Sequence, residues 1–360
     1  MSRHRRLTTL AVVPLALMVL APVGSVLAAD TISVSPGESI QAAIDPAPDG
    51  ATIAIAPGTY EGNLEIIRSL HLVGPGAIVV PATTPTTNTC VGPLLPGVTG
   101  LCIHGGMTDQ GTITTRIADV SVEGITVQGF SGPGIIVAGV DGFTAADDVV
   151  ANNGFWGLFV SSSSDITLTG NTAYGNGSDG IHVDSAPKAN AVIVGNSSYA
   201  NVGTGILFLD ALGGRIARND VHDDCAGMLI AATGTPGQEG GGNVTVELNE
   251  VTANNRLCPA QPGQAPAYGG VGIAIIGAKD TIVELNDIRD NVEQTGSGIA
   301  GGGIVLLDAK MFGAGAPTGI TVTLDRLSGN GPNDIHDDGS GTGNTVSGNT
   351  CTTTDLKGAC

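Results

Sequence analysis

The segment GSDGIHVD, near the middle of the chain, holds three side chains that can move protons. Asp179, His182 and Asp184 supply two carboxyl groups and an imidazole, which are common general acids and bases in enzymes. If the segment is an extended strand, side chains alternate between its faces, so His182 and Asp184 project from the same face. Paired carboxylates can act as acid and base in glycoside hydrolysis. We therefore predict that Asp179, His182 and Asp184 are catalytic.

The elements that must position these groups recur along the chain. A glycine followed by an aliphatic strand occurs seven times, and the first four intervals are 23, 23, 25 and 22 residues. The seven glycines are Gly134, Gly157, Gly180, Gly205, Gly227, Gly272 and Gly303. Each unit is too short for a strand and a helix and has no helical periodicity, so each strand must pair with its equivalent one coil away. The sequence predicts an all-β fold, a right-handed parallel β-helix built as a solenoid of coils of about 23 residues.

A second series of strands ends in the pattern Asn-x4-Asn, or a close variant, out of phase with the first series. The pattern begins at Asn171, Asn196, Asn219, Asn249 and Asn286. Stacked coils place these amides above one another, where they can form a hydrogen-bonded ladder along the axis. We expect a structural role for them, because a turn residue that repeats in every coil usually serves the turn.

The stacking register adds three residues to the candidate site. Phe159 takes the position of His182 one coil earlier, and Trp156, the single tryptophan, takes the position of Asp179. Asp210 ends the equivalent strand one coil later. An aromatic ring can pack on the C–H groups of a sugar while carboxylates bind its hydroxyls. We therefore assign Trp156, Phe159 and Asp210 to substrate binding.

The remaining outward positions of these strands are mostly apolar, which a polysaccharide groove does not require. They are Ile136, Leu207, Leu209, Leu229, Ile276, Val305 and Leu307. An apolar face of this size is usually covered, either by a loop such as 81–112 or 258–270 or by a second copy of the chain. Parallel sheets are also often apolar on both faces, so the alternative interpretation of the His182 cluster is a polar gap in a packed face.

The start of the chain has the order of a secretory signal peptide: a basic cluster, an apolar run from Leu7 to Leu27, and small residues at 28–29. Pro14 and Pro22 interrupt the run, which favours a cleaved signal over a membrane anchor. Its removal takes three of the 14 basic residues and none of the 33 acidic ones, which leaves a formal charge of −22. Such a charge argues against nucleic acid and anionic membranes as partners and favours a neutral glycan over a polyuronate.

Six cysteines form three close pairs: Cys90 with Cys102, Cys225 with Cys258, and Cys351 with Cys360. In an exported protein, such pairs are typical of disulfides. A metal site is the alternative, but no CxxC or HxxxH spacing accompanies them, so we predict three local disulfides and no metal ligands.

The segment Ser33–Gly76 contains a short amphipathic helix pattern at Ser39–Asp45, followed by PDGATIAIAPGTYEGNLEIIRSLHLVGPG. It resembles the N-terminal segment of the pectin-lyase-like right-handed β-helix superfamily, and the repeats after Asp119 are similar to the generic β-helix repeat. The resemblance covers nearly all of the mature chain and implies this fold, with the helix as a cap on the first coil. It leaves the function open, because one scaffold hosts lyases, hydrolases, esterases, epimerases and binding proteins.

Motifs of individual enzyme subfamilies are partial or absent. The segments GSDGIHVD and HDDC are similar to two polygalacturonase strands, although His182 stands where that family has Asp. NDIHDD, near the end of the chain, is loosely similar to the Asp-Pro-His-Asp strand of alginate-type epimerases. Motifs typical of pectin methylesterases are missing, as is the Arg or Lys base of pectate lyases. For HDDC and NDIHDD we favour a role as turns.

We divide the chain into a signal peptide (1–29), a β-helix (30–350) and a disulfide-closed tail (351–360). Within the β-helix we expect an N-terminal cap and first coils at 30–80, a loop insertion at 81–112 and repeat coils at 113–350.

These features together predict a secreted, extracellular carbohydrate-active protein that acts on a polysaccharide as a glycoside hydrolase or through related lyase or epimerase chemistry. The alternatives are a non-catalytic exported β-helix that binds glycan or self-associates through its apolar face, and a periplasmic maturation-type scaffold. No organic cofactor and no membrane span after signal removal are expected. Ca²⁺ is the ion that acidic turns such as Asp147-Asp148 and Asp223-Asp224 could hold.

Overall fold

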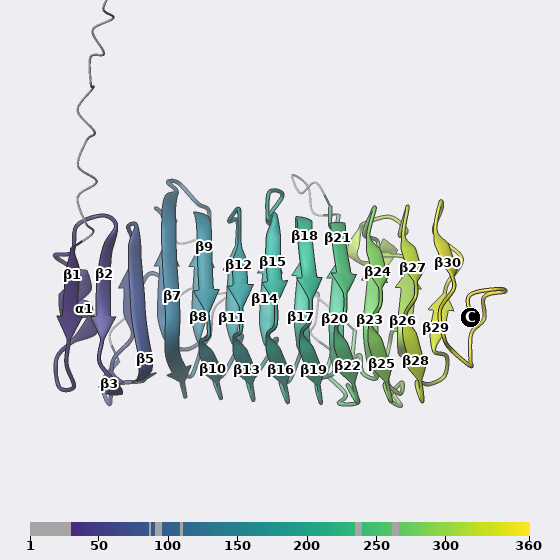
Figure 1. Ribbon diagram of the computed structural model, residues 1–360, viewed down its shortest axis with the longest axis horizontal. Coiled ribbons are helices and arrows are strands. Elements are labelled where there is room, and N and C mark those ends of the chain that lie inside the picture. The colour runs from purple at the N-terminus through teal and green to yellow at the C-terminus, as the bar shows by residue number, and fades with distance from the viewer. Residues whose placement is uncertain (1–29, 86–87, 91–95, 109–110, 235–239, 261–265) are drawn as a thin grey trace, which may run out of the picture.

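The computed structural model describes residues 30–85, 88–90, 96–108, 111–234, 240–260 and 266–360. The predicted signal peptide at 1–29 lies outside them. In the described chain, equivalent strands of successive coils pair in parallel and build two long sheets that run the length of an elongated molecule (Figure 1). The fold is the predicted parallel β-helix.

One sheet has ten strands and carries the candidate site. Its strands are β4 (Leu64–Ile66), β6 (Leu101–His104), β8 (Ile135–Ala138), β11 (Leu158–Ser161), β14 (Ile181–Asp184), β17 (Thr204–Leu209), β20 (Ala226–Ala231), β23 (Val271–Ile276), β26 (Gly302–Leu307) and β29 (Ile335–Asp337). We call it the ten-stranded sheet.

The other sheet has twenty strands, which form two series of equivalent strands from successive coils. We call each series a run. The first run comprises β1 (Thr31–Val34), β2 (Ala51–Ile55), β5 (Leu70–Val80), β7 (Ile117–Gln128), β9 (Val140–Ala146), β12 (Thr167–Thr169), β15 (Ala191–Val194), β18 (Leu212–Ala217), β21 (Gly242–Glu247), β24 (Ile282–Glu284), β27 (Thr321–Thr323) and β30 (Thr345–Ser347). The second comprises β3 (Gly58–Glu61), β10 (Val149–Ala151), β13 (Thr172–Tyr174), β16 (Ser197–Tyr199), β19 (Asp220–His222), β22 (Glu250–Thr252), β25 (Asp287–Arg289) and β28 (Arg326–Ser328). β5 and β7 pair with strands of both runs.

The interior of the coils is a continuous apolar core. Aliphatic side chains alternate with outward ones along each strand, as in β15, where Ala191 and Ile193 are buried. Phe130, Phe143 and Phe208 are its largest fully buried members. Removing this surface from water is the main favourable contribution to folding.

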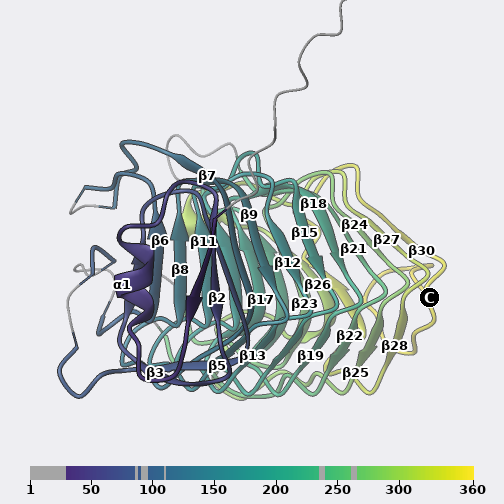
Figure 2. The same ribbon diagram turned by 60° about the vertical axis from the view of Figure 1, so that its left-hand side comes forward.

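A short helix, α1 (Ile40–Ile44), closes the N-terminal end of the stack (Figures 1 and 2). The Ser39 hydroxyl caps it by accepting the amide of Ala42 at 3.2 Å, and the buried side chains of Ile40 and Ile44 pack on the core. The helix covers an end that would otherwise expose unpaired strand edges, so the predicted cap is confirmed. A 3-10 turn, η1 (Lys310–Phe312), lies in a later loop.

Two ladders of asparagines follow the axis of the stack, as predicted. Each side-chain Oδ1 accepts the main-chain N–H of the equivalent residue one coil earlier, and most amides also donate to the next Oδ1. The first ladder consists of Asp148, Asn171, Asn196, Asn219, Asn249, Asn286, Asp325 and Asn349. The second consists of Asn153, Asn176, Asn201, Asp224, Asn254, Asn291 and Asn330.

The ladders include two of the acidic residues considered for Ca²⁺. Asp148 and Asp224 are buried members of the ladders. Their Oδ1 atoms accept main-chain N–H groups from Ile125 and Asn201. These two carboxyl groups therefore serve the coil interior.

The segment 81–112 corrects one prediction, because it is not a loop throughout. It contains β6, which pairs with β4 on one side and β8 on the other and so completes a coil of the ten-stranded sheet. The sequence pattern does not reveal this four-residue strand, because Pro, Thr and Gly residues surround it.

All three predicted disulfides are present: Cys90–Cys102, Cys225–Cys258 and Cys351–Cys360. Disulfides are typical of proteins that fold in an oxidising compartment, which fits an exported protein. No helix in the described ranges is long and apolar enough to span a membrane.

Candidate functional site

Strand β14 positions the central residues of the candidate site. Ile181 and Val183 are fully buried in the coil, whereas His182 and Asp184 project from the outer face of the ten-stranded sheet. The register pairs His182 with Phe159 on β11 and with Leu207 on β17, as the repeat spacing predicts.

Three rings form a compact cluster beside this strand. The rings of Trp156 and Phe159 stack with centroids 4.2 Å apart and an interplanar angle of 12°. The imidazole of His182 stands edge-on to both, with centroids 5.4 Å from Trp156 and 5.0 Å from Phe159. Both aromatic rings are half-buried, so part of their surface faces solvent. The structure thus brings together the three residues that the sequence placed on neighbouring coils.

The imidazole of His182 is paired with a carboxylate. Its Nδ1 lies 3.1 Å from Oδ2 of Asp179, with the two side chains only 5% and 9% exposed. Neither imidazole nitrogen of His182 has a hydrogen-bond partner among the described residues, and both are buried. The other oxygen of Asp179 accepts the main-chain N–H of Thr204 at 2.8 Å. Asp179 is therefore anchored, whereas the imidazole of His182 lies beside it with neither nitrogen hydrogen-bonded.

Asp184 is the second acid of the site. Burial raises its pKa and the nearby charge of Asp210 adds to this, while His182 and a hydrogen bond from Ser185 act in the opposite direction. The Ser185 hydroxyl donates to Oδ1 of Asp184 at 2.9 Å. The net effect is a pKa above that of an exposed aspartate, which is the direction that a general acid needs.

Asp210, predicted to bind substrate, is held by the next coil. Its side chain is nearly inaccessible and accepts the main-chain N–H of Thr233 at 2.8 Å, as well as the Thr233 hydroxyl. Asp210 therefore acts on the cluster through its charge beside Asp184 and holds the next coil.

Tyr268 is a site neighbour that the sequence interpretation missed. Its hydroxyl lies 3.2 Å from the hydroxyl of Thr204, the residue whose main chain anchors Asp179. Burial raises the pKa of Tyr268, and the charge of Asp179 raises it further. The signal was weak, because a single tyrosine in a Pro- and Gly-rich insertion has no repeat position to place it.

Loops of the chain itself cover the ten-stranded sheet on both sides of the cluster. Toward the N-terminus, the Cys90–Cys102 disulfide and Met107 pack against Ile136 and Phe159. Toward the C-terminus, the apolar outward face is packed against side chains from three insertions. Tyr268, Ile299, Phe312 and Ala314 are the covering residues. The covering loops expected from 81–112 and 258–270 are confirmed.

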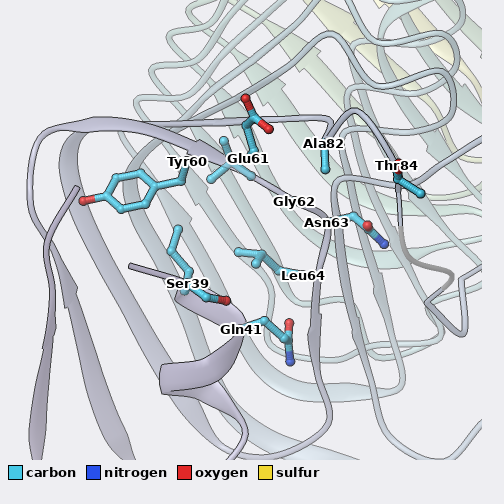
Figure 3. Close-up of a pocket in the computed structure, with 11 residues that line it drawn as sticks. Ser39, Gln41, Tyr60, Glu61, Gly62, Asn63, Leu64, Ala82 and Thr84 are labelled. Carbon is cyan, nitrogen blue, oxygen red and sulfur yellow. The ribbon is translucent and has the colours of Figure 1, made fainter. Parts of the chain in front are cut away.

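A pocket of about 250 Å³ lies elsewhere, at the N-terminal cap (Figure 3). Figure 3 shows Tyr60 directing its hydroxyl away from the other labelled side chains, and this hydroxyl donates to the carbonyl of Ala56 at 2.7 Å. The Ser39 hydroxyl is engaged in capping α1, and the Gln41 amide is bonded to the main chain of Glu65. The pocket contains none of the predicted catalytic residues, and much of its polar lining is used by the fold.

Comparison with known proteins supports the architecture. A sequence profile described as "Right handed beta helix region" matches residues 107–288, half of the chain. No curated protein matches the chain at the sequence level.

Several solved structures are similar to this one. The A-module of mannuronan C-5 epimerase AlgE6 from Azotobacter vinelandii aligns with a TM-score of 0.61 and 19% identity, over 89% of this chain and 91% of that one. The A-module of AlgE4 from the same organism aligns with a TM-score of 0.55 and 17% identity, over 89% and 93%. The Dettilon tailspike protein aligns with a TM-score of 0.57 and 14% identity, over 91% of this chain and 60% of that one. At these identities the likeness concerns the fold. With the profile match and the parallel coils described above, the chain belongs to the right-handed β-helix family.

Proposed function

We propose that this protein is an exported carbohydrate-active β-helix that acts on an extracellular polysaccharide at the outer face of β14. The observation that supports this most strongly is the cluster of Trp156, Phe159 and His182, with Asp179 in contact with the imidazole. Aromatic surface beside ionisable groups suits a sugar, whose C–H face is apolar and whose hydroxyls are polar. The epimerases with the same fold are named for a polysaccharide, mannuronan.

In this proposal the half-buried rings of Trp156 and Phe159 bind the pyranose face of the substrate. Asp184 donates a proton to the glycosidic oxygen, because burial keeps its carboxyl group protonated to a higher pH than an exposed aspartate. His182, oriented by Asp179, accepts the proton that the attacking water releases. The formal charge of −22 on the mature chain favours a neutral glycan over a polyuronate, since like charges repel.

The second candidate is a glycan-binding β-helix without turnover. It is favoured by the enclosure of Asp179 and His182, whose side chains offer little surface to a substrate until a covering group moves. In this case the rings bind the glycan, and the buried contact between Asp179 and His182 only supports them.

The deciding experiment screens residues 30–360 for binding and product formation on neutral and acidic polysaccharides, with and without Ca²⁺. Asp184→Asn and His182→Ala are the test variants. The matched control is Asp165→Asn, since Asp165 is an exposed acid in the turn before β12 that is bonded to Asn190. Turnover lost in both test variants and kept in the control supports the enzyme. Binding without turnover supports the second candidate. A protein that neither binds nor converts any glycan overturns both.

A further inference from the structure

A second histidine and acid cluster lies at the N-terminal end of the ten-stranded sheet. The register pairs Glu65 on β4 with Cys102 on β6, and His104 is the next outward residue on β6. One donor atom from each of these three residues lies within 4.8 Å of the other two. Cys102 is joined to Cys90, so a second sulfur is adjacent to the same cluster. Two sulfurs, one imidazole and one carboxylate are therefore gathered outside the coil.

The imidazole and the carboxylate are already held in place by second contacts. Nδ1 of His104 faces the carbonyl oxygen of Gly105, and Nε2 lies 3.0 Å from Oε1 of Glu65. The same Oε1 accepts the main-chain N–H of Thr89 at 2.9 Å. Metal-binding histidines and carboxylates usually have such supporting hydrogen bonds.

We propose that reduction of the Cys90–Cys102 disulfide converts this cluster into a zinc site, with Cys90, Cys102, His104 and Glu65 as its four ligands. Zn²⁺ binds thiolate, imidazole and carboxylate in a closed tetrahedron. Nitrogen and oxygen ligands about 2.0 Å from a tetrahedral ion lie about 3.3 Å apart, so the 3.0 Å separation of His104 and Glu65 needs only a small adjustment. Once the covalent bond is broken, the sulfurs can separate to the roughly 3.8 Å that two thiolate ligands need.

The reaction that opens the site is a thiol–disulfide exchange. A dithiol reductant supplies two electrons and two protons, the S–S bond breaks, and the reductant becomes a disulfide while Cys90 and Cys102 become thiols. Zinc binding then displaces one proton from each thiol, and the metal keeps its oxidation state. Cys90 and Cys102 cannot form the disulfide and bind the metal at the same time. The disulfide is suited to an oxidising compartment and the zinc site to a reducing one.

The test compares reduced and oxidised protein in one background, in which Cys225, Cys258, Cys351 and Cys360 are replaced by Ser. Zinc content is measured after dialysis, and Co²⁺ is used as a spectroscopic probe because thiolate ligands give it a charge-transfer band. We expect one zinc per reduced chain, none per oxidised chain, and a thiolate–cobalt band only after reduction. Wild-type protein under the same reductant controls for misfolding of the background. Equal zinc content in both redox states, or no zinc in the reduced state of either protein, overturns the proposal.

Ligand variants separate this site from adventitious binding. His104→Ala and Glu65→Gln should each weaken zinc binding to the reduced protein about 100-fold or more, since loss of a supporting contact alone costs 10–100-fold. His336→Ala is the matched control, because His336 also pairs with an acid, Asp355, but lies on the last strand of the sheet. Zinc binding that is unaffected by the first two variants, or equally weakened by the control, contradicts the assignment.

Discussion

The carboxyl group of Asp325 takes the place of an amide in the first ladder. Its Oδ1 accepts both the main-chain and the side-chain N–H of Asn286, each at 2.8 Å. Its Oδ2 is buried without a hydrogen-bond partner among the described residues, at the position from which ladder amides donate to a main-chain carbonyl. A protonated carboxyl group restores that donor, so the ladder favours the neutral form of Asp325.

The first prediction is a stability that falls as pH rises. Burial raises the pKa of Asp148 to about 8 and of Asp325 to about 7, and it also raises the pKa of Asp224. Each group keeps its proton when folded and loses it when unfolded above about pH 4, so the folded state loses up to about 1.4 kcal/mol per pH unit per carboxyl. The free energy of unfolding should decline between about pH 4 and pH 8 and then level off.

Urea denaturation at a series of pH values measures this slope. Asp148→Asn and Asp325→Asn should flatten it and stabilise the protein at pH 8 (about one unit above the pKa of Asp325), because an amide can donate where a carboxylate cannot. Asp49→Asn, at an exposed position, should leave the slope unchanged. An unchanged slope in the ladder variants would show that these carboxyl groups are ionised in the folded protein.

The second prediction concerns the ladders as structural elements. Asn219 is buried, accepts two N–H groups of Asn196, and donates to the carbonyl of Ile193 and to Oδ1 of Asn249. Asn219→Ala should lower the free energy of unfolding by about 3 kcal/mol or more, because it leaves buried donors without acceptors. Asn333→Ala, outside both ladders, should cost much less when both are followed by circular dichroism during denaturation.

The third prediction separates glycan binding from stability. Trp156→Ala should reduce glycan affinity about tenfold or more while the free energy of unfolding changes by about 1 kcal/mol, because the ring is half-buried. Ile181→Asp should unfold the coil, since it places an unpaired charge in the core. Calorimetric titration and thermal melts provide the two readouts. Destabilisation by Trp156→Ala as large as that by Ile181→Asp would mean that the ring is part of the core.

The fourth prediction is the pH dependence of any turnover. Activity that needs protonated Asp184 should fall as pH rises through the raised pKa of this group, and the decline should lie above that of an exposed aspartate. Asp184→Glu should shift the pH at which activity declines, and Asp184→Asn should abolish turnover while preserving binding. If activity declines at the same pH in Asp184→Glu as in the wild type, another residue is the proton donor.

The repeat made much of this structure predictable. A 23-residue period determines which residues stack. The sequence alone therefore predicts that Phe159 stacks with His182 and that the asparagines stack on one another. Strand alternation then predicted that Ile181 points inward and His182 outward. These inferences held because every coil obeys the same steric and hydrogen-bonding constraints.

The covering loops could not be predicted in the same way. Tyr268, Phe312 and Met107 lie in insertions that have no period, so no register relates them to the sheet that they cover. Tyr268 reaches Thr204, whose main chain binds Asp179, so an insertion contributes to the environment of a residue on the outer side of the coil. Alternation predicts the direction of a side chain, but its exposure depends on contacts distant in sequence.

The ladders also give the stack a direction of growth. In each ladder the amide of one coil donates to the coil that follows, so a coil formed during synthesis has unsatisfied donors until the next one is added. At the last coil, the side chain of Asn349 donates to the carbonyl of Ala359 at 3.1 Å, within the loop closed by Cys351 and Cys360. The segment 351–360 thus accepts the hydrogen bond that a following coil would otherwise accept. A chain shortened by these ten residues would present open donors at its end, where a further coil from another molecule could add.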